Sequence, residues 1–259
     1  MGESIVITSG KGGSGKSTVA VNLGAALAAS GRSVVLVDMD MGMRSLDILC
    51  GLENKIVYDL ADVADGLCRV KQAIVKHPSI EGLHLVSAAQ TRGSDAISPA
   101  RSREVMEELK ARFDHVLIDC PAGVGRGFRN AASGADRALI VSLTDPVSLR
   151  DAERVAGLLA RSDILSPALA FNRVLPRRGR RGENTLLELA DRMGLTLVGI
   201  IPEDPSIQAA MPDKRAAQAS SPAVRAIREL SRRLMGEDLP FAGLPREPLI
   251  KRIVRAIVQ

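Results

Sequence analysis

The amino-acid sequence predicts an α/β fold, a single domain built on a mostly parallel, twisted sheet with helices on both faces. Two observations support this prediction. Short apolar runs rich in Val, Ile and Leu alternate with longer helical patterns along the 259 residues, which is typical of βαβ units around a buried parallel sheet. A glycine-rich octapeptide also separates the first apolar run from the first helical segment. The length suits one large domain of this class.

The elements follow from this alternation. Seven apolar runs are predicted strands: residues 4–9, 33–38, 83–87, 115–119, 138–142, 168–172 and 197–201. Four segments have clear helical patterns: residues 17–30, 99–112, 148–161 and 185–193. In open α/β sheets the ligand binds beyond the carboxyl ends of the strands. We therefore expect the residues at those ends to converge on one rim, namely Gly10, Asp38, Asp119, Asn172 and Pro202.

The composition narrows the classes of function. Lys and Arg exceed Asp and Glu by 35 to 30, but aromatic residues make up only 2% of the chain. So few aromatic side chains argue against binding single-stranded nucleic acid by stacking, whereas the excess of positive charge permits contact with phosphates or anionic lipid. The three cysteines form no CxxC pair, and no run approaches the about 18 apolar residues of a membrane span. We expect a cytoplasmic protein whose membrane contact, if any, is peripheral.

Residues 10–17 match the phosphate-loop pattern G-x-x-x-x-G-K-[ST], between a predicted strand and a predicted helix. Glycines let backbone N–H groups turn toward a phosphate, and the helix start adds partial positive charge. Lys16 is expected to neutralise phosphate oxygens, and the Ser17 hydroxyl to bind Mg²⁺. The sequence thus predicts a P-loop NTPase. Its predicted nucleotide cradle comprises Gly12, Gly13, Ser14, Gly15, Lys16, Ser17 and Thr18.

Carboxylates follow two of the predicted strands. Asp38 and Asp40 flank Met39 at the end of the second strand, so in an extended chain they point to the same face. Asp119 ends the apolar run 115–119, the Walker B pattern, in which the carboxylate holds a water of the Mg²⁺ shell. The predicted metal group is Ser17, Asp38 and Asp119, in which Asp38 either supports the metal ligands or stabilises the site in general.

The last eleven residues form a separate pattern. Projected at about 100° per residue, they place apolar side chains on one side and three cations on the other. Apolar bulk opposite cations is typical of a helix lying in a membrane surface; a last core or dimer helix is the alternative. The predicted membrane contacts are Leu249, Ile250, Lys251, Arg252, Ile253, Val254, Arg255 and Ile257. The chain therefore divides into a domain at 1–238, a proline-rich linker at 239–248 and this tail at 249–259.

The octapeptide KGGSGKST, residues 11–18, resembles the deviant Walker motif of the MinD/ParA ATPases. The resemblance covers nearly the whole chain and includes "VYDL" at 57–60 and "AAQTR" at 88–92. Three departures are Ser14 and Ser17 in place of the commoner Val and Thr, and Ser45 in place of Asn. Residues 211–220 do not reproduce the family pattern.

The resemblance implies roles for individual residues. Lys11 would reach across an ATP-sandwich homodimer to the partner's phosphates, in the manner of an arginine finger. Asp40 would orient the attacking water; because phosphoryl transfer has a loose transition state, positioning suffices and strong base catalysis is not needed. Asn172 would read adenine, and Pro202 and Glu203 would lie over its ring. Lys11, Lys16 and Asp40 are thus the predicted catalytic residues, with ATP and Mg²⁺ as cofactors.

The resemblance also implies a cellular role. A dimer formed on ATP would attach two tails to an anionic membrane surface, recruit a MinC-like division inhibitor and help place the division septum. Hydrolysis would release it, with the spatial cue coming from a MinE-like activator or a polar scaffold. The helix at 148–161, with Arg150, Asp151 and Arg154, resembles the region that meets such partners.

Three other classes stay open at this point. A flagellar-number regulator would share both the phosphate loop and the tail. A ParA-like DNA-partition ATPase could use a stretch of arginines uninterrupted by acid, namely Arg173, Arg177, Arg178, Arg180 and Arg181. A nitrogenase iron-protein type would need cluster cysteines, of which only Cys120 lies near the predicted site. We do not expect nucleic acid as the partner, because the apolar face of the tail has no use in DNA binding.

Overall fold

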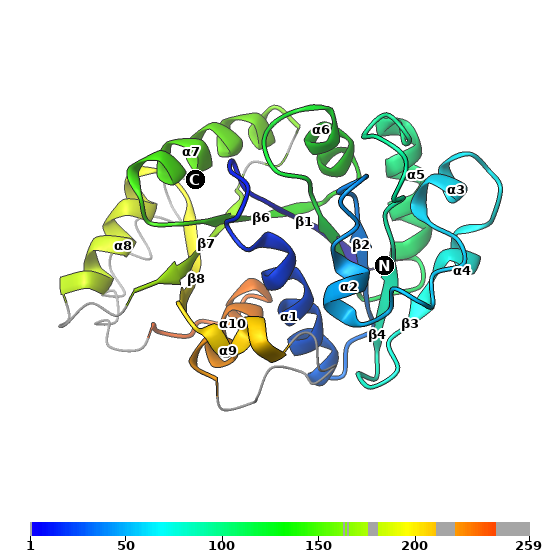
Figure 1. Cartoon of the computed structure of the whole chain (residues 1–259). Coiled ribbons are helices and arrows are strands. Elements are labelled where there is room, and N and C mark those ends of the chain that lie inside the picture. Colours follow the sequence, from blue (N-terminus) through cyan, green and yellow to red (C-terminus); the bar gives the residue numbers. More distant parts are fainter. Residues whose placement is uncertain (1, 163, 165, 176–180, 211–220, 242–259) are drawn as a thin grey trace.

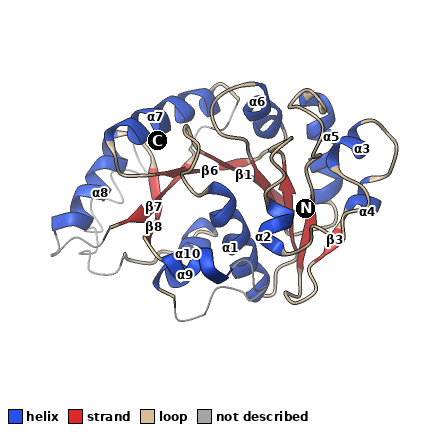
Figure 2. Ribbon diagram, viewed as in Figure 1, coloured by secondary structure: helices blue, strands red, loops and turns tan. Residues whose placement is uncertain are grey.

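A computed structural model describes residues 2–162, 164, 166–175, 181–210 and 221–241, and their side chains except at 181–184 and 208–210. In this part of the chain the strands form one sheet (Figure 2), with the strand order β3-β4-β2-β5-β1-β6-β7-β8. All neighbours pair in parallel except β3 with β4. The strands are β1 (Glu3–Thr8), β2 (Val34–Asp38), β3 (Val75–Lys76), β4 (Leu83–Val86), β5 (His115–Asp119), β6 (Arg137–Ser142), β7 (Ala168–Val174) and β8 (Thr196–Pro202). The predicted fold class and all seven predicted strands are confirmed.

The described helices include the four that the sequence predicts and several more. The helices are α1 (Lys16–Ala29), α2 (Leu46–Cys50), α3 (Leu60–Ala64), α4 (Val70–Ala73), α5 (Pro99–Lys110), α6 (Arg126–Ser133), α7 (Pro146–Ala160), α8 (Arg181–Arg192), α9 (Pro205–Ala210) and α10 (Pro222–Leu234). The predicted helices at 17–30, 99–112, 148–161 and 185–193 correspond to α1, α5, α7 and α8. Their observed ends differ from the predicted ones by four residues or fewer.

Helices cover both faces of the sheet (Figure 1), and a hydrophobic layer lies on each face. Ile5 and Ile7 of β1 point into a layer made with α1, α2, α9 and α10. Val6, between them, points to the opposite layer, made with helices α3 to α8. Because side chains alternate along a strand, a strand buried on both faces needs an unbroken apolar sequence, which is the pattern of the central strands.

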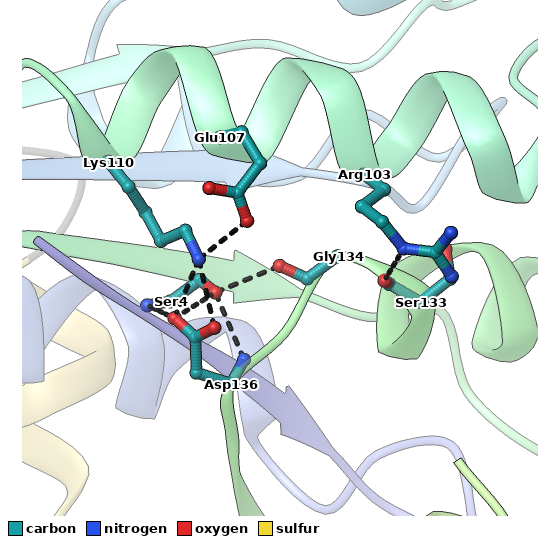
Figure 3. Close-up of polar contacts among 7 residues, drawn as sticks. All are labelled: Ser4, Arg103, Glu107, Lys110, Ser133, Gly134 and Asp136. Atoms are coloured by element: carbon teal, nitrogen blue, oxygen red, sulfur yellow. Dashed lines mark hydrogen bonds and ion pairs between the residues drawn. The ribbon is translucent and has the colours of Figure 1, made fainter. Parts of the chain in front are cut away.

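A cluster of polar side chains links α5, β1 and the start of β6 at the end of the sheet opposite the phosphate loop (Figure 3). The Lys110 ammonium, on α5, lies 2.9 Å from a carboxylate oxygen of Asp136 and 2.7 Å from one of Glu107. Asp136 also accepts hydrogen bonds from the backbone N–H and the hydroxyl of Ser4, at 2.8 and 2.9 Å. The cluster joins α5, β1 and the start of β6, and so holds the strands whose other ends carry the site.

The polypeptide after α10 is held against the domain by Arg233. Its guanidinium donates to the carbonyls of Leu239 and Pro240, at 2.9 and 3.0 Å. It also lies 4.0 Å from the centre of the Phe241 ring, a cation–π contact. The first three residues of the predicted linker thus pack on the domain. The rest of the linker and the predicted tail at 249–259 lie outside the described residues.

No helix within the described part of the chain is both long and apolar enough to cross a membrane.

Candidate functional site: a phosphate loop and two buried aspartates

The phosphate loop connects β1 to α1 and depends on two glycines with left-handed backbone angles. Gly13 and Gly15 have φ of 78° and 88°, a region that other residues adopt only with strain. A Cβ on Gly15 would also collide with the amide nitrogen of Asn172. Helix α1 begins at the next residue and has no side-chain cap. The N–H groups of its first turn are therefore open to an anion, as in known phosphate sites.

The loop also packs against α7, the helix that the sequence associates with partner binding. A Cβ on Gly10 would collide with the side chain and backbone of Asp151, so the start of the loop and the body of α7 are in direct contact. At the start of α7, Asp145 accepts hydrogen bonds from the backbone N–H groups of Val147 and Ser148. Hydrogen bonds from Ser148 hold the pKa of Asp145 below its usual range, and the Lys11 ammonium adds to this effect. The exposed Lys11 therefore lies near Asp145, the N-cap residue of α7.

Asp38 and Asp119 end the adjacent strands β2 and β5 and lie opposite each other in register. Their exposures are 0% and 1%. Asp38 accepts backbone hydrogen bonds from Asp40 at 2.9 Å and from Ser45 and Leu46 at 3.0 Å each. It therefore fastens the loop between β2 and α2.

Asp119 differs from Asp38 in the hydrogen bonds that its carboxylate accepts. Although buried, neither of its carboxylate oxygens accepts a hydrogen bond from the described residues. Burial, followed by the charge of Asp38, raises the pKa of Asp119 to about 7, while the nearby Ser17 hydroxyl, which does not reach full hydrogen-bond geometry, and the Lys16 ammonium lower it by less. Burial likewise raises the pKa of Asp38 to about 6. Two buried carboxylates side by side, one of them without a partner, form a site that a cation would stabilise.

The predicted metal residues fit Mg²⁺ when a phosphate supplies further ligands. Mg²⁺ in nucleotide sites is held by one or two protein oxygens, phosphates and waters. Ser17 can supply a protein oxygen and Asp119 can hold a water of the Mg²⁺ shell, whereas three of the lone pairs of Asp38 are already engaged by backbone donors. Accordingly, the described residues contain no cluster of three His, Cys, Asp or Glu that would cage a metal by themselves.

Lys16 and Asp40 lie close to this pair. Lys16 is 7% exposed, and its ammonium lowers the pKa values of both Asp40 and Asp119. Burial has the larger effect on Asp40 and raises its pKa. Asp40 is half-buried and so can reach solvent from the rim, the position that a water-orienting carboxylate requires.

Asn172 and Glu203 are the residues that the family resemblance places beside a base. The Asn172 amide donates to the backbone carbonyl of Ser14, 2.8 Å away, inside the phosphate loop. Glu203 accepts a hydrogen bond from the Nε of Arg173 at 2.8 Å. Arg173, the first arginine of the basic stretch, is therefore paired within the chain. Pro202 ends β8 opposite Val174. The contact of Asn172 with the loop could not be inferred from topology, which brings it only to the same rim.

The structure adds two residues that the sequence did not assign to the site. The hydroxyl of Ser45 lies 3.3 Å from that of Ser17; its only sequence signal was its departure from the family pattern. Asn130, on α6, donates to the carbonyls of Ser94 and Ile97 at 2.8 Å each. It thereby holds the loop that follows "AAQTR" against the helix after Asp119.

Cys120 does not have the properties of a cluster ligand. It is fully buried, and burial raises the pKa of its thiol to about 12. A cluster shared between two copies needs a thiol at the surface, whereas that of Cys120 is buried. The position therefore gives no support to an iron–sulfur function.

Together these features define a nucleotide-binding protein with a phosphate loop and an acidic metal position. The sequence profile of the CobQ/CobB/MinD/ParA nucleotide binding domain matches residues 5–215. The chain belongs to the MinD/ParA family.

Its relatives within that family include septum site-determining proteins. The chain is 42% identical to MinD of Bacillus subtilis, over 95% of this chain and 94% of the relative. MinD in the MinC:MinD complex of Aquifex aeolicus superposes with a TM-score of 0.82 at 38% identity, covering 92% of this chain and 98% of that one. MinD of Pyrococcus horikoshii complexed with Mg-ADP gives 0.80 at 29% identity, covering 91% and 97%.

Proposed function

We propose that this protein is an ATPase that dimerises on ATP, attaches to the inner face of the cell membrane and recruits a MinC-like inhibitor, so helping to place the division septum. The observation that carries the proposal is the unpartnered carboxylate of Asp119 beside an uncapped helix start. Such an arrangement leaves both an anion position and a cation position open, which is what a nucleotide with Mg²⁺ supplies. The similarity to MinD proteins over most of the chain supports the cellular role.

Each residue of the site has its own role in binding or hydrolysis. Lys16 and the N–H groups at the start of α1 bind phosphate oxygens, while Ser17 and Asp119 hold Mg²⁺. The bound Mg²⁺ supplies positive charge against the phosphate oxygens. Asp40 orients the attacking water. Lys11, which is exposed, is free to reach the phosphates of a second copy, and charge stabilisation of this kind is the main source of rate in phosphoryl transfer.

Helix α7 is the surface proposed for the MinC-like partner and for a MinE-like activator or polar scaffold. Arg150 and Arg154 are exposed, as is Val147, with 59% of its surface accessible. Asp151 on the same helix contacts Gly10 of the phosphate loop. A partner bound to α7 therefore touches an element in direct contact with the start of the phosphate loop, so its binding can depend on the bound nucleotide.

Hydrolysis and dimerisation test the first half of the proposal. The wild-type chain should release phosphate from ATP and elute as a dimer with ATP but as a monomer with ADP. Lys11→Ala should bind ATP yet lose most of the hydrolysis, whereas Lys71→Ala, an exposed lysine on α4, should behave as wild type. Equal rates for Lys11→Ala and Lys71→Ala would refute the role of Lys11.

Vesicle binding tests the second half. Two tails on one dimer bind with avidity that a single tail lacks, so sedimentation with anionic vesicles should require ATP. Ile253→Glu should abolish it and Ile253→Leu should preserve it. Equal sedimentation of the wild type and Ile253→Glu, with ATP and with ADP, would remove the membrane mechanism while leaving the ATPase intact.

A further inference from the structure

Ser45 has an unusual environment for a serine at the start of a helix. It occupies the N-cap position of α2, where a serine hydroxyl normally accepts a hydrogen bond from the first turn. Its side chain makes no such bond. Asp38 accepts the N–H groups of both Ser45 and Leu46 instead, each at 3.0 Å. The buried carboxylate thus performs the capping, and the hydroxyl of Ser45 is free for another contact.

That contact is with Ser17. The Ser45 hydroxyl donates toward the Ser17 oxygen at 3.3 Å, between α2 and α1, which pack against each other. A hydroxyl oxygen has two lone pairs. The hydrogen bond from Ser45 uses one of them and so leaves the other for a cation. The Ser17 oxygen is thereby oriented before any metal arrives.

Asp38, which binds the backbone of Ser45, also fastens the loop that contains Asp40. The backbone N–H of Asp40 is bound to one oxygen of Asp38 at 2.9 Å, and that of Ser45 is bound to the other. Inside this loop Arg44 has a φ of 46°, a strained angle for a residue with a side chain. It is held there by an ion pair with Asp47 at 2.6 Å. Ser45 is therefore the point at which this constrained loop meets the predicted metal ligand.

We infer that Ser45 is a positioning residue of the metal site. Its hydroxyl orients Ser17 for Mg²⁺ and links the Asp40 loop to metal binding. The inference rests on the proposed function, since it needs the Mg²⁺ site formed by Ser17 and Asp119. It assigns Ser45 no direct contact with the metal or the nucleotide.

The test is the Mg²⁺ dependence of binding of a fluorescent ADP analogue, measured at equilibrium in EDTA and across a titration of free Mg²⁺. Loss of a group that orients a metal ligand costs about tenfold or more in metal affinity. Ser45→Ala should therefore need about tenfold more Mg²⁺ for the half-maximal effect, with its binding in EDTA unchanged. Ser45→Thr, which keeps the hydroxyl, should restore the wild-type response.

A matched control separates this role from general loss of stability. Ser30→Ala removes a hydroxyl bonded to the Leu27 carbonyl, 2.6 Å away, just past the other end of α1, and should leave the titration unchanged. An Mg²⁺ response in Ser45→Ala equal to that of the wild type would overturn the assignment of Ser45 alone. A wild-type chain with no Mg²⁺ response would overturn the proposed function, and this inference with it.

Discussion

The side-chain amide of Asn172, at the carboxyl end of β7, donates a hydrogen bond to the backbone carbonyl of Ser14 in the phosphate loop, 2.8 Å away. The amide occupies the space that a Cβ on Gly15 would need. A strand on one side of β1 thus supports the loop that β1 leads into. The glycine and the asparagine depend on each other, because only a residue without a side chain admits the amide.

Asn172→Ala should weaken nucleotide binding about five- to tenfold, the effect of losing one hydrogen bond of about 1 kcal/mol. Equilibrium binding of ADP with Mg²⁺ measures it. Asn22→Ala is the matched control, since Asn22 makes a bond of the same length to a carbonyl, that of Thr18 on α1, without bracing the loop. If both variants bound ADP equally well, the support from Asn172 would be ruled out.

Two glycines, one where the loop contacts α7 and one further along α7, should respond to alanine in opposite ways. Gly10→Ala places a methyl group against Asp151 and should lower both the free energy of unfolding and ADP affinity. Gly157 lies within α7 and faces open space, so Gly157→Ala should stabilise the protein by about 0.5–1 kcal/mol through helix propensity. Urea unfolding measures both. A Gly10→Ala variant as stable as the wild type would mean that the loop and α7 separate at little cost.

The cluster around Lys110 should contribute measurably to stability. Lys110 is 7% exposed and faces Glu107 and Asp136, each nearly half exposed. Lys110→Met keeps the length of the side chain but leaves both carboxylates without their cation, so unfolding in urea should show a loss of about 1–3 kcal/mol. Lys71→Met, at an exposed site on α4, should change stability by about 0.5 kcal/mol or less. Similar values for the two variants would contradict a role for the cluster.

Asp204 should make the free energy of unfolding depend on pH in the acid range. Its carboxylate accepts hydrogen bonds from Ser206 and Ser221 and so joins the starts of α9 and α10. Hydrogen bonds from the two hydroxyls lower its pKa from 3.8 to about 2. Because the folded-state pKa is the lower one, this contribution is complete above about pH 4 and disappears as the pH falls toward 2.

The corresponding measurement is the urea midpoint between pH 6 and pH 2. Asp204→Asn should be less stable than the wild type near neutrality, and the difference should shrink as the pH falls through that range. Asp95→Asn, at an exposed position, should follow the wild-type curve. A constant difference between wild type and Asp204→Asn at every pH would show that the charge of Asp204 contributes nothing.

Most of the sheet and the long helices between strands could be predicted, because each has a local pattern. An unbroken apolar run suffices for a buried strand, and the βαβ alternation locates the helix that follows. α10 escaped prediction because it comes after β8, where the alternation ends. α2, α3 and α4 escaped because five residues or fewer do not complete two helical turns, and the antiparallel β3 is only two residues long.

The phosphate loop and the acidic strand ends were determined by the sequence itself, since a phosphate site needs glycines, a lysine and a hydroxyl at fixed spacing within one segment. Only the tertiary structure decided how the strand ends differ from one another. β5 lies between β2 and β1, which sets Asp119 beside Asp38; the backbone then engages one carboxylate and leaves the other bare. The tertiary structure also places Ser45 against Ser17 and Asn172 against Ser14. These relationships depend on strand order and on the packing of separate segments, and no local pattern encodes them.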